Sequence, residues 1–495
     1  MGPKRKRRRQ AWVGLPSLII ALIPAACTVG PDYVRSTAPV PASYKELKGW
    51  KKATPSDDID RGDWWSVFKD QKLNNLESQV EISNQTVAAS EAAYWQSLAI
   101  IKETQASLFP TVSANYTSTG SHFGAQAVGS GLGTGITKTV STISANASWS
   151  PDLWGRIRRT IESDVAAAQV SAGDLANAKL SAQAMLATAY YNLRAADALQ
   201  ALFHRTAVAF KRTLEITQHQ YDAGTVSKAD VDTALAQLLN TQAMEIGVGV
   251  TRAQFEHAIA ALMGKPPADL SIPPIPLGYR LPDVPVSVPS ALLERRPDIA
   301  ATERAMQQQN ALIGAAIALY YPNVSLTGLF GFTGVGALAL SLANEVWSIG
   351  GTVAETVFDA GSRDAQVEAA IATYKQSVAN YRQTVLTAFQ QVEDQLAAIR
   401  IFAREQKVAD DSVKAAQEEV DILLNQYRAG TVAFTAVVVA QAMLLTNEES
   451  ALTVRQNRFL ATVALIQDLG GGWYSALLPS GHALETRNPI IPDLQ

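Results

Sequence analysis

The stretch Gln220-Tyr221-Asp222-Ala223-Gly224-Thr225-Val226 decides the architecture of this chain, because it returns as Gln426-Tyr427-Arg428-Ala429-Gly430-Thr431-Val432. Each copy lies between long alanine-rich segments with a helical pattern. Each is also preceded by a proline and an alternating polar and apolar stretch, which starts at Pro110 in the first copy and at Pro322 in the second. A repeat of this length indicates that one structural unit was duplicated. We therefore expect two tandem structural repeats that form the halves of one body.

The N-terminus is predicted to be an export signal over residues 1–26, with a basic run from Lys4 to Arg9 and a short apolar stretch after it. The only cysteine, Cys27, follows two alanines directly, so it is interpreted as the lipidation site of a bacterial lipoprotein. Pro24 stands where an aliphatic residue is usual, and the alternative is an incidental cysteine within the signal.

Charge and hydropathy narrow the class of protein. The signal holds six of the 42 basic residues and no acidic one, so the mature chain keeps 36 basic against 45 acidic residues, a net charge of −9. This charge argues against nucleic acid as a partner and suits a mildly cation-favouring lumen. No run of about eighteen apolar residues follows the signal, so any crossing of a bilayer would require β-strands.

Four segments alternate between apolar and Ser, Thr or Asn side chains, which predicts two β-hairpins, at 111–150 and 322–357. Their length suits a tilted bilayer crossing, with Gly/Ser-rich loops around 120–138 and 333–342 outside the cell. A soluble hairpin packed on a core is the alternative. The apolar parity consists of Val112, Ala114, Tyr116, Ile143, Ala145, Ala147, Trp149, Val324, Leu326, Phe330, Trp347, Ile349 and Val353.

Long helices are predicted between these hairpins and the repeated motifs. Apolar residues from Val367 to Ile399 recur every three or four positions, close to a coiled-coil repeat. A helix from 360 to 427 would span about 100 Å, longer than the helices of a globular bundle, which is the alternative. Gly224 and Gly430 are expected to end these helices, and Ser227 or Thr431 to cap the next ones.

These patterns give a predicted domain order along the chain. A helix is expected from about Leu73 to Leu108, before the first β-hairpin. The order is signal 1–26, extended lipid-anchored tether 27–65, first repeat 66–275 with its helical tip at 221–227, proline-rich linker 276–289, second repeat 290–475 with its tip at 427–433, and C-terminal tail 476–495.

Four antiparallel strands cannot close on themselves, and open edges in lipid would leave backbone amides unsatisfied. The strands must therefore pair with those of other copies. Two copies give a barrel filled by its own side chains, whereas three give twelve strands and an aqueous lumen. We expect a symmetric trimer whose long helical hairpins encircle one end of the pore.

One further segment carries a specific resemblance. Leu292-Leu293-Glu294-Arg295-Arg296-Pro297-Asp298-Ile299 is followed by ALIGAAIALYYPNVS at 311–325, and the mature chain would start Cys27-Thr28-Val29-Gly30-Pro31-Asp32-Tyr33. These residues resemble the outer-membrane factor family, the TolC-like channels, and within it the efflux lipoproteins similar to OprM and NodT. Arg295, Arg296, Pro297 and Asp298 match the signature of that family.

The resemblance implies a mostly α fold with a transmembrane β-barrel. A homotrimeric, 12-stranded β-barrel in the bacterial outer membrane, with four strands per chain, would continue into a long α-helical barrel in the periplasm. It implies the exit duct of a tripartite efflux system for small toxic compounds, with a periplasmic adaptor and an inner-membrane pump, of the RND type, as partners. The duct of a type I protein secretion system is the closest alternative.

The resemblance also implies a gate at the helical tips, around Tyr221, Gly224 and Gly430. A hydrogen bond between Tyr427 and Asp230 is the gate hypothesis; the alternative is that Tyr427 only packs and Asp230 is solvated. Where the family can carry charged constricting residues, this chain has Val432, Ala436 and Val439, so an apolar seal is expected.

No enzyme is predicted, and no cofactor or metal. The five histidines have no metal-ligand spacing, and no catalytic constellation or phosphate-binding loop is present in the sequence. A trimeric surface adhesin is the remaining alternative, although its strands would lie at one terminus and not between helices in both halves. The five histidines without metal-ligand spacing are His122, His204, His219, His257 and His482.

Overall fold

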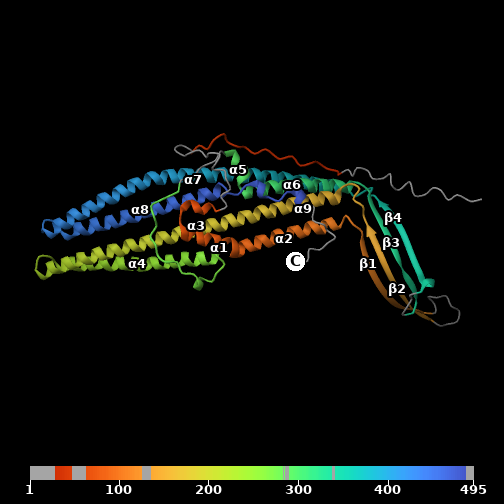
Figure 1. The fold of residues 1–495 in the computed structure, drawn as a ribbon, viewed down its shortest axis with the longest axis horizontal. Helices are drawn as coiled ribbons and strands as arrows, with labels where there is room; N and C mark the ends of the chain where they lie inside the picture. Colours follow the sequence, from red (N-terminus) through yellow and green to blue (C-terminus); the bar gives the residue numbers. More distant parts are fainter. Residues whose placement is uncertain are drawn as a thin grey trace, which may run out of the picture.

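The computed structural model describes residues 28–46, 63–124, 135–282, 284, 289–336 and 341–485. The described chain is elongated, with a β-sheet at one end and two helical hairpin tips at the other (Figure 1). The predictions for the signal 1–26 and for lipidation at Cys27 lie outside the described residues, as do residues 125–134 and 337–340 of the loops in the two β-hairpins.

The two repeats share the order helix, helix, strand, strand, long helix, helix, and the last two helices match in length. Helices α3 and α7 are each 67 residues long, and α4 and α8 are each 35 residues long. The first repeat contains η2 (Trp64–Phe68), α1 (Gln71–Ser83), α2 (Gln85–Ala106), β1 (Thr111–Phe123), β2 (Ile136–Trp149), α3 (Arg156–Asp222) and α4 (Lys228–Leu262). The second contains α5 (Pro289–Arg295), α6 (Pro297–Ile317), η4 (Ala318–Tyr320), β3 (Asn323–Val335), η5 (Leu342–Asn344), β4 (Glu345–Ala354), α7 (Ser362–Arg428) and α8 (Phe434–Asp468). The short elements η3 (Pro267–Asp269), η6 (Ser475–Leu477) and α9 (Gly481–Glu485) follow α4 and α8.

Among the helices of the described ranges, none combines the length and the apolar character that a membrane span requires.

The strands form one antiparallel sheet in the order β1-β2-β3-β4. The central pair joins the two repeats, since β2 pairs with β3 from Val140 opposite Val335 to Trp149 opposite Leu326. The apolar strand residues predicted from the sequence lie on one face of the sheet. Several of them, including Val112, Phe330 and Ile349, are exposed. β1 and β4 are the edges of the sheet.

The helix expected from Leu73 to Leu108 is two helices, because the chain is extended at Asn84. The Asn84 side chain accepts hydrogen bonds from the backbone N–H groups of Thr86 and Val87 and so caps α2. Its amide also donates to the carbonyl of Leu262, 2.7 Å away, at the end of α4. Asn84 thus both caps α2 and fixes the break to the end of α4, and helical periodicity reveals neither role.

The tips confirm one capping expectation and correct another. Ser227 caps α4 in a reciprocal capping box with Asp230. Thr431 does not cap α8, whose N-terminal flanking residue is Ala433 with no side-chain bond. Instead, both the N–H and the hydroxyl of Thr431 donate to the carbonyl of Gln426, which closes the end of α7.

The main core lies at the waist, the level at which α1 packs on α3 and at which α4 ends (Figure 1). Residues 28–46 run extended along the outside of α3, α6 and α7. Arg159 of α3, 4% exposed, binds the carbonyls of Val29 and Gly30, and Tyr44 is buried against Phe389 of α7. The N-terminal segment is therefore a strap across both repeats.

One core side chain is unusual. Glu77 of α1 is fully buried, and neither of its carboxylate oxygens has a hydrogen-bond partner among the described residues. Burial raises the pKa of this carboxyl from 4.5 to about 9, so the group is neutral at pH 7.

Glu77→Gln is expected to flatten the pH dependence of stability. Between pH 4.5 and about 9 the folded chain keeps a proton on Glu77 that the unfolded chain releases. Stability therefore falls as the pH rises through this window, by up to about 1.4 kcal/mol per pH unit, and the amide removes this slope. Thermal melting of the detergent-solubilised protein from pH 5 to 9 measures it. Equal slopes for the variant and the wild type would contradict a neutral Glu77.

Candidate functional site

The two helical tips of one chain are joined by an apolar cluster. Its buried members are Ala234 of α4, Tyr427 of α7, and Phe434 and Val437 of α8. Partly buried side chains from both hairpins pack around them: Leu214, Ile216, Val226, Leu423, Leu424, Val432 and Val438. Separation of the tips would expose this cluster to water, so the cluster favours the joined arrangement.

Three side-chain hydrogen bonds cross the same seam. The Tyr427 hydroxyl donates to Thr217, 3.4 Å away, and the Gln441 amide donates to Thr213, 3.2 Å away. The Gln237 amide donates to the carbonyl of Val438 at 3.3 Å. We call these three contacts the tip ladder.

The two threonines are well suited to accept. Each hydroxyl donates to a carbonyl of its own helix four residues earlier, which leaves an oxygen lone pair for Tyr427 or Gln441. Thr217 is fully buried, and Thr213, Tyr427 and Gln441 are nearly so. Sequence reasoning missed Thr213, Thr217 and Gln441. The only signal is two threonines four residues apart on the buried face of α3.

The two residues of the gate hypothesis, Tyr427 and Asp230, have different hydrogen-bond partners in the structure. Asp230 is half-buried, and its carboxylate accepts from the N–H and hydroxyl of Ser227. Tyr427 is buried against Phe434, with ring centroids 5.2 Å apart. Burial raises the pKa of the Tyr427 hydroxyl, and the nearby charge of Asp230 adds to the rise. Within one chain, both groups therefore have other partners, and their mutual hydrogen bond stays a prediction.

The remaining predicted tip residues are solvent-accessible. Gly224 and Gly430 have positive φ angles at the ends of the two turns, and Tyr221 is exposed beside the first. Val439 is 64% exposed on α8, whereas Val432 and Ala436 are half-buried. Val432 packs against the apolar cluster, whereas Val439 is open to solvent.

A groove separates the hairpins behind the tips, and we call it the hairpin groove. It has a volume of about 570 Å³ and lies between α3, α7 and α8. Arg205 and Glu448 form an ion pair at 3.6 Å on its rim. The side-chain carbonyl oxygen of Gln441 is buried in its wall with no hydrogen-bond partner among the described residues. The groove therefore offers charges at its rim, and an unpaired acceptor lies buried behind its wall.

The predicted signature forms a clamp at the waist. The Arg296 guanidinium binds the Asp298 carboxylate through two nitrogens, at 3.0 and 2.7 Å. It also donates to the carbonyl of Asp468, the last residue of α8, at 3.1 Å. Burial raises the pKa of the Asp468 carboxyl to about 6, against the opposing effect of Arg296. Pro297 opens α6, where the absence of an N–H costs nothing.

The first repeat has the equivalent clamp in neutral form. There Asn84 binds the last carbonyl of α4, and Ser83 donates to the carbonyl of Met263 at 2.6 Å. In both repeats a glycine with positive φ follows the helix and approaches the opposing backbone. A Cβ on Gly264 would lie 2.1 Å from the carbonyl oxygen of Ser83, and one on Gly470 would lie 2.0 Å from that of Arg295.

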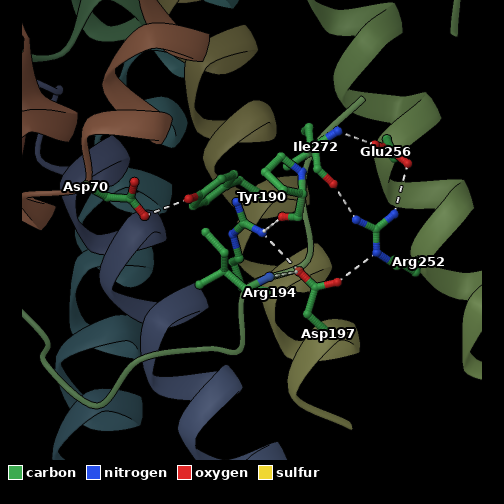
Figure 2. A network of polar contacts seen from close by, with 9 residues as sticks. Asp70, Tyr190, Arg194, Asp197, Arg252, Glu256 and Ile272 are labelled. Atoms are coloured by element: carbon green, nitrogen blue, oxygen red, sulfur yellow. Dashed lines mark hydrogen bonds and ion pairs between the residues drawn. The ribbon is translucent and has the colours of Figure 1, made fainter. Parts of the chain in front are cut away.

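A buried polar network holds residues 272–275, the end of the first repeat just before the linker (Figure 2). Asp197 is its centre: its carboxylate accepts from Arg194 at 2.9 Å, from Arg252 at 2.8 Å and from the N–H of Ile275 at 2.9 Å. The other contacts are Tyr190 with Asp70, Arg194 with the carbonyl of Pro273, and Arg252 and Glu256 with the backbone of Ile272. The segment 272–275 that leads into the linker is therefore fixed against α3 and α4.

Comparison with known proteins decides the family. The model of the outer membrane efflux protein family matches residues 76–265 and 288–471, which are the two repeats. The chain belongs to the outer membrane efflux protein family.

Similar proteins agree with this assignment. The chain is 29% identical to the probable efflux pump outer membrane protein TtgC of Pseudomonas putida, over 92% of this chain and 95% of that protein. It is 29% identical to outer membrane protein OprJ of Pseudomonas aeruginosa, over 94% and 97% of the two chains. The solved outer-membrane channel OprN is similar in fold, with a TM-score of 0.81, 27% identity and coverage of 90% and 100%.

Membership confirms several predictions. The fold is mostly helical with a four-stranded antiparallel sheet in each chain. The protein is an efflux channel of the outer membrane, with its helical part in the periplasm. The predicted homotrimer with an adaptor and an inner-membrane pump is the assembly that the family implies.

Two glycines allow the waist clamp to be tested. Gly430→Ala places a residue at φ 72° with nothing within 4 Å, so backbone strain of about 1–2 kcal/mol is the expected cost. Gly470→Ala adds a collision with the Arg295 carbonyl, so we expect a clearly larger drop in the melting temperature. Circular dichroism of both variants in detergent measures the difference. Equal drops would show that the clamp does not require this close approach.

Proposed function

We propose that three copies of this chain close into a single outer-membrane exit duct that passively conducts small toxic compounds. The observation that carries the proposal is a four-stranded sheet with two free edges, joined to two pairs of very long helices. Pairing of β4 of one copy with β1 of the next would satisfy both edges, and three copies would give twelve strands around an aqueous lumen.

The helices supply the length that such a duct needs. A 67-residue helix is about 100 Å long, and α3 and α7 both run from the sheet to the tips (Figure 1). A trimer would carry six such helical hairpins in a cylinder. This duct needs no catalytic group, and we assign none to the chain.

The hairpin groove is our candidate docking place for the periplasmic adaptor. Gln441 and Glu448 line the groove on the side of α8 opposite Val439 and Met443, which are exposed. If Val439 faces the pore, the groove faces the periplasm. We propose an RND-type pump as the energy source. The relatives TtgC and ArpC are named as outer membrane proteins of efflux pumps, which favours efflux over type I protein secretion.

We further propose that the tip ladder and the apolar cluster hold the gate shut. Tyr427 would act through Thr217, while Asp230 would serve to cap α4. We also propose lipidation at Cys27 and an apolar seal at Val432, Ala436 and Val439.

Single-channel conductance in planar bilayers tests the duct and the gate together. Tyr427→Phe and Thr217→Val each remove the same hydrogen bond, worth about 1 kcal/mol per chain, or about fivefold in the closed-to-open ratio. We expect discrete water-filled conductance steps, with a similar rise in open probability for each variant and no further rise for the double variant.

Asp230→Ala is the matched control, because alanine offers Tyr427 no acceptor while Ser227 remains to cap α4. We expect it to gate like the wild type. A rise equal to that of Tyr427→Phe would restore the Tyr427–Asp230 bond as the latch. The absence of any conductance from well-folded trimers would contradict the duct itself.

A further inference from the structure

The apolar face of the sheet has a depression at its centre. Its floor consists of Ala145 and Ala147 of β2 and Gly328 of β3, and Val112, Phe330, Trp347 and Ile349 form its walls. The register explains this shape, because two rows of residues cross the sheet side by side. One row is Val112, Ala147, Gly328 and Ile349, and the next is Ala114, Ala145, Phe330 and Trp347.

The depression is a groove of about 440 Å³ with almost no polar surface. Its wall side chains stand clear of the sheet, with Val112, Trp347 and Ile349 each about 70% exposed or more. An apolar groove of this kind, open to solvent, would be costly in water and is filled in a bilayer.

Gly328 is the residue that the chain itself does not explain. It has no positive φ angle, so its backbone conformation does not require glycine. A Cβ there would meet only the Ala147 methyl carbon, at an ordinary contact distance of 3.9 Å. Glycine in a strand interior weakens the sheet and often marks the close approach of a ligand. The space above Gly328 is therefore kept open for something outside the chain.

A second copy does not fit as the occupant. In the proposed trimer, copies would pair through the backbone edges of β1 and β4, whereas the floor of the groove lies on the two central strands. A polar headgroup does not fit either, since no charged side chain lines the groove. The chemistry that remains is a hydrocarbon chain.

The position of the groove indicates which leaflet supplies it. Its lower end lies at Val112 and Ala147, beside the end of the sheet that joins the helices, and it rises to the middle of β3. Trp149 and Trp154 lie at that same end, with their indole N–H groups bound to the carbonyls of Leu108 and Pro322. Tryptophans at this level mark the membrane–water interface. The helical part is periplasmic, so the groove rises from the periplasmic leaflet.

We propose that this groove is a binding site for one acyl chain of a phospholipid of the periplasmic leaflet. Phe330, Trp347 and Ile349 would flank the chain, and Gly328 would let it reach the backbone of the sheet. The proposal rests on placement in the outer membrane and not on conduction through the duct.

Native mass spectrometry of the detergent-purified trimer tests the site, with phosphatidylethanolamine as the probe. We expect the wild type to retain one phosphatidylethanolamine per chain. Gly328→Leu fills the groove and should retain none under the same detergent conditions. Val353→Leu enlarges a residue on the same face outside the groove, and should retain lipid like the wild type.

Equal retention by Gly328→Leu and the wild type would overturn the proposal, as would a retained lipopolysaccharide in place of a phospholipid. Ala147→Leu fills the floor of the same groove from β2. It replaces Gly328→Leu in the test if that variant does not assemble into trimers. Conductance recorded on the same samples separates this result from the proposed duct, because both leucine variants should conduct like the wild type.

Discussion

The free edges of β1 and β4 are the constraint on which the rest of this molecule depends. In lipid, each unpaired backbone amide of an edge strand costs several kcal/mol, and one chain supplies only four strands. Closure by symmetry removes both edges at once. It also places the long helices of each copy side by side in a ring, so the same closure that satisfies the sheet builds the periplasmic cylinder.

Duplication explains how the long hairpins are held. In both repeats a glycine of positive φ follows the last long helix, α4 or α8. This glycine lies against the backbone just before α2 in the first repeat and just before α6 in the second. The first repeat completes this clamp with Asn84, and the second completes it with Arg296 and Asp298. The family signature at 295–298 is therefore the charged version of the waist clamp, which Asn84 forms without charge in the first repeat. The waist is fixed by these clamps and by the Asp197 network, whereas the tips are joined by weaker contacts.

Local patterns made the strands and tips predictable. Alternation predicts which face of β1 to β4 is apolar, and glycine at 224 and 430 predicts the helix ends, because both signals act within a few residues. The break at Asn84 was missed, because helical periodicity reveals neither the local cap nor the bond to the carbonyl of Leu262 in another helix. Thr431 resembles a cap but closes the preceding turn. Thr213 and Thr217 carry no distinctive signal, because polar residues on a helix are ordinary until the partner across the seam is known.

The subunit count of the protein extracted from its membrane tests the central claim most directly. Native mass spectrometry of the assembly in lipid nanodiscs would give this number without any assumption about substrate or pump. Closure of four-stranded sheets around an aqueous lumen predicts three copies of the chain and a single species. A stable monomer or dimer as the only membrane-embedded species would contradict the account.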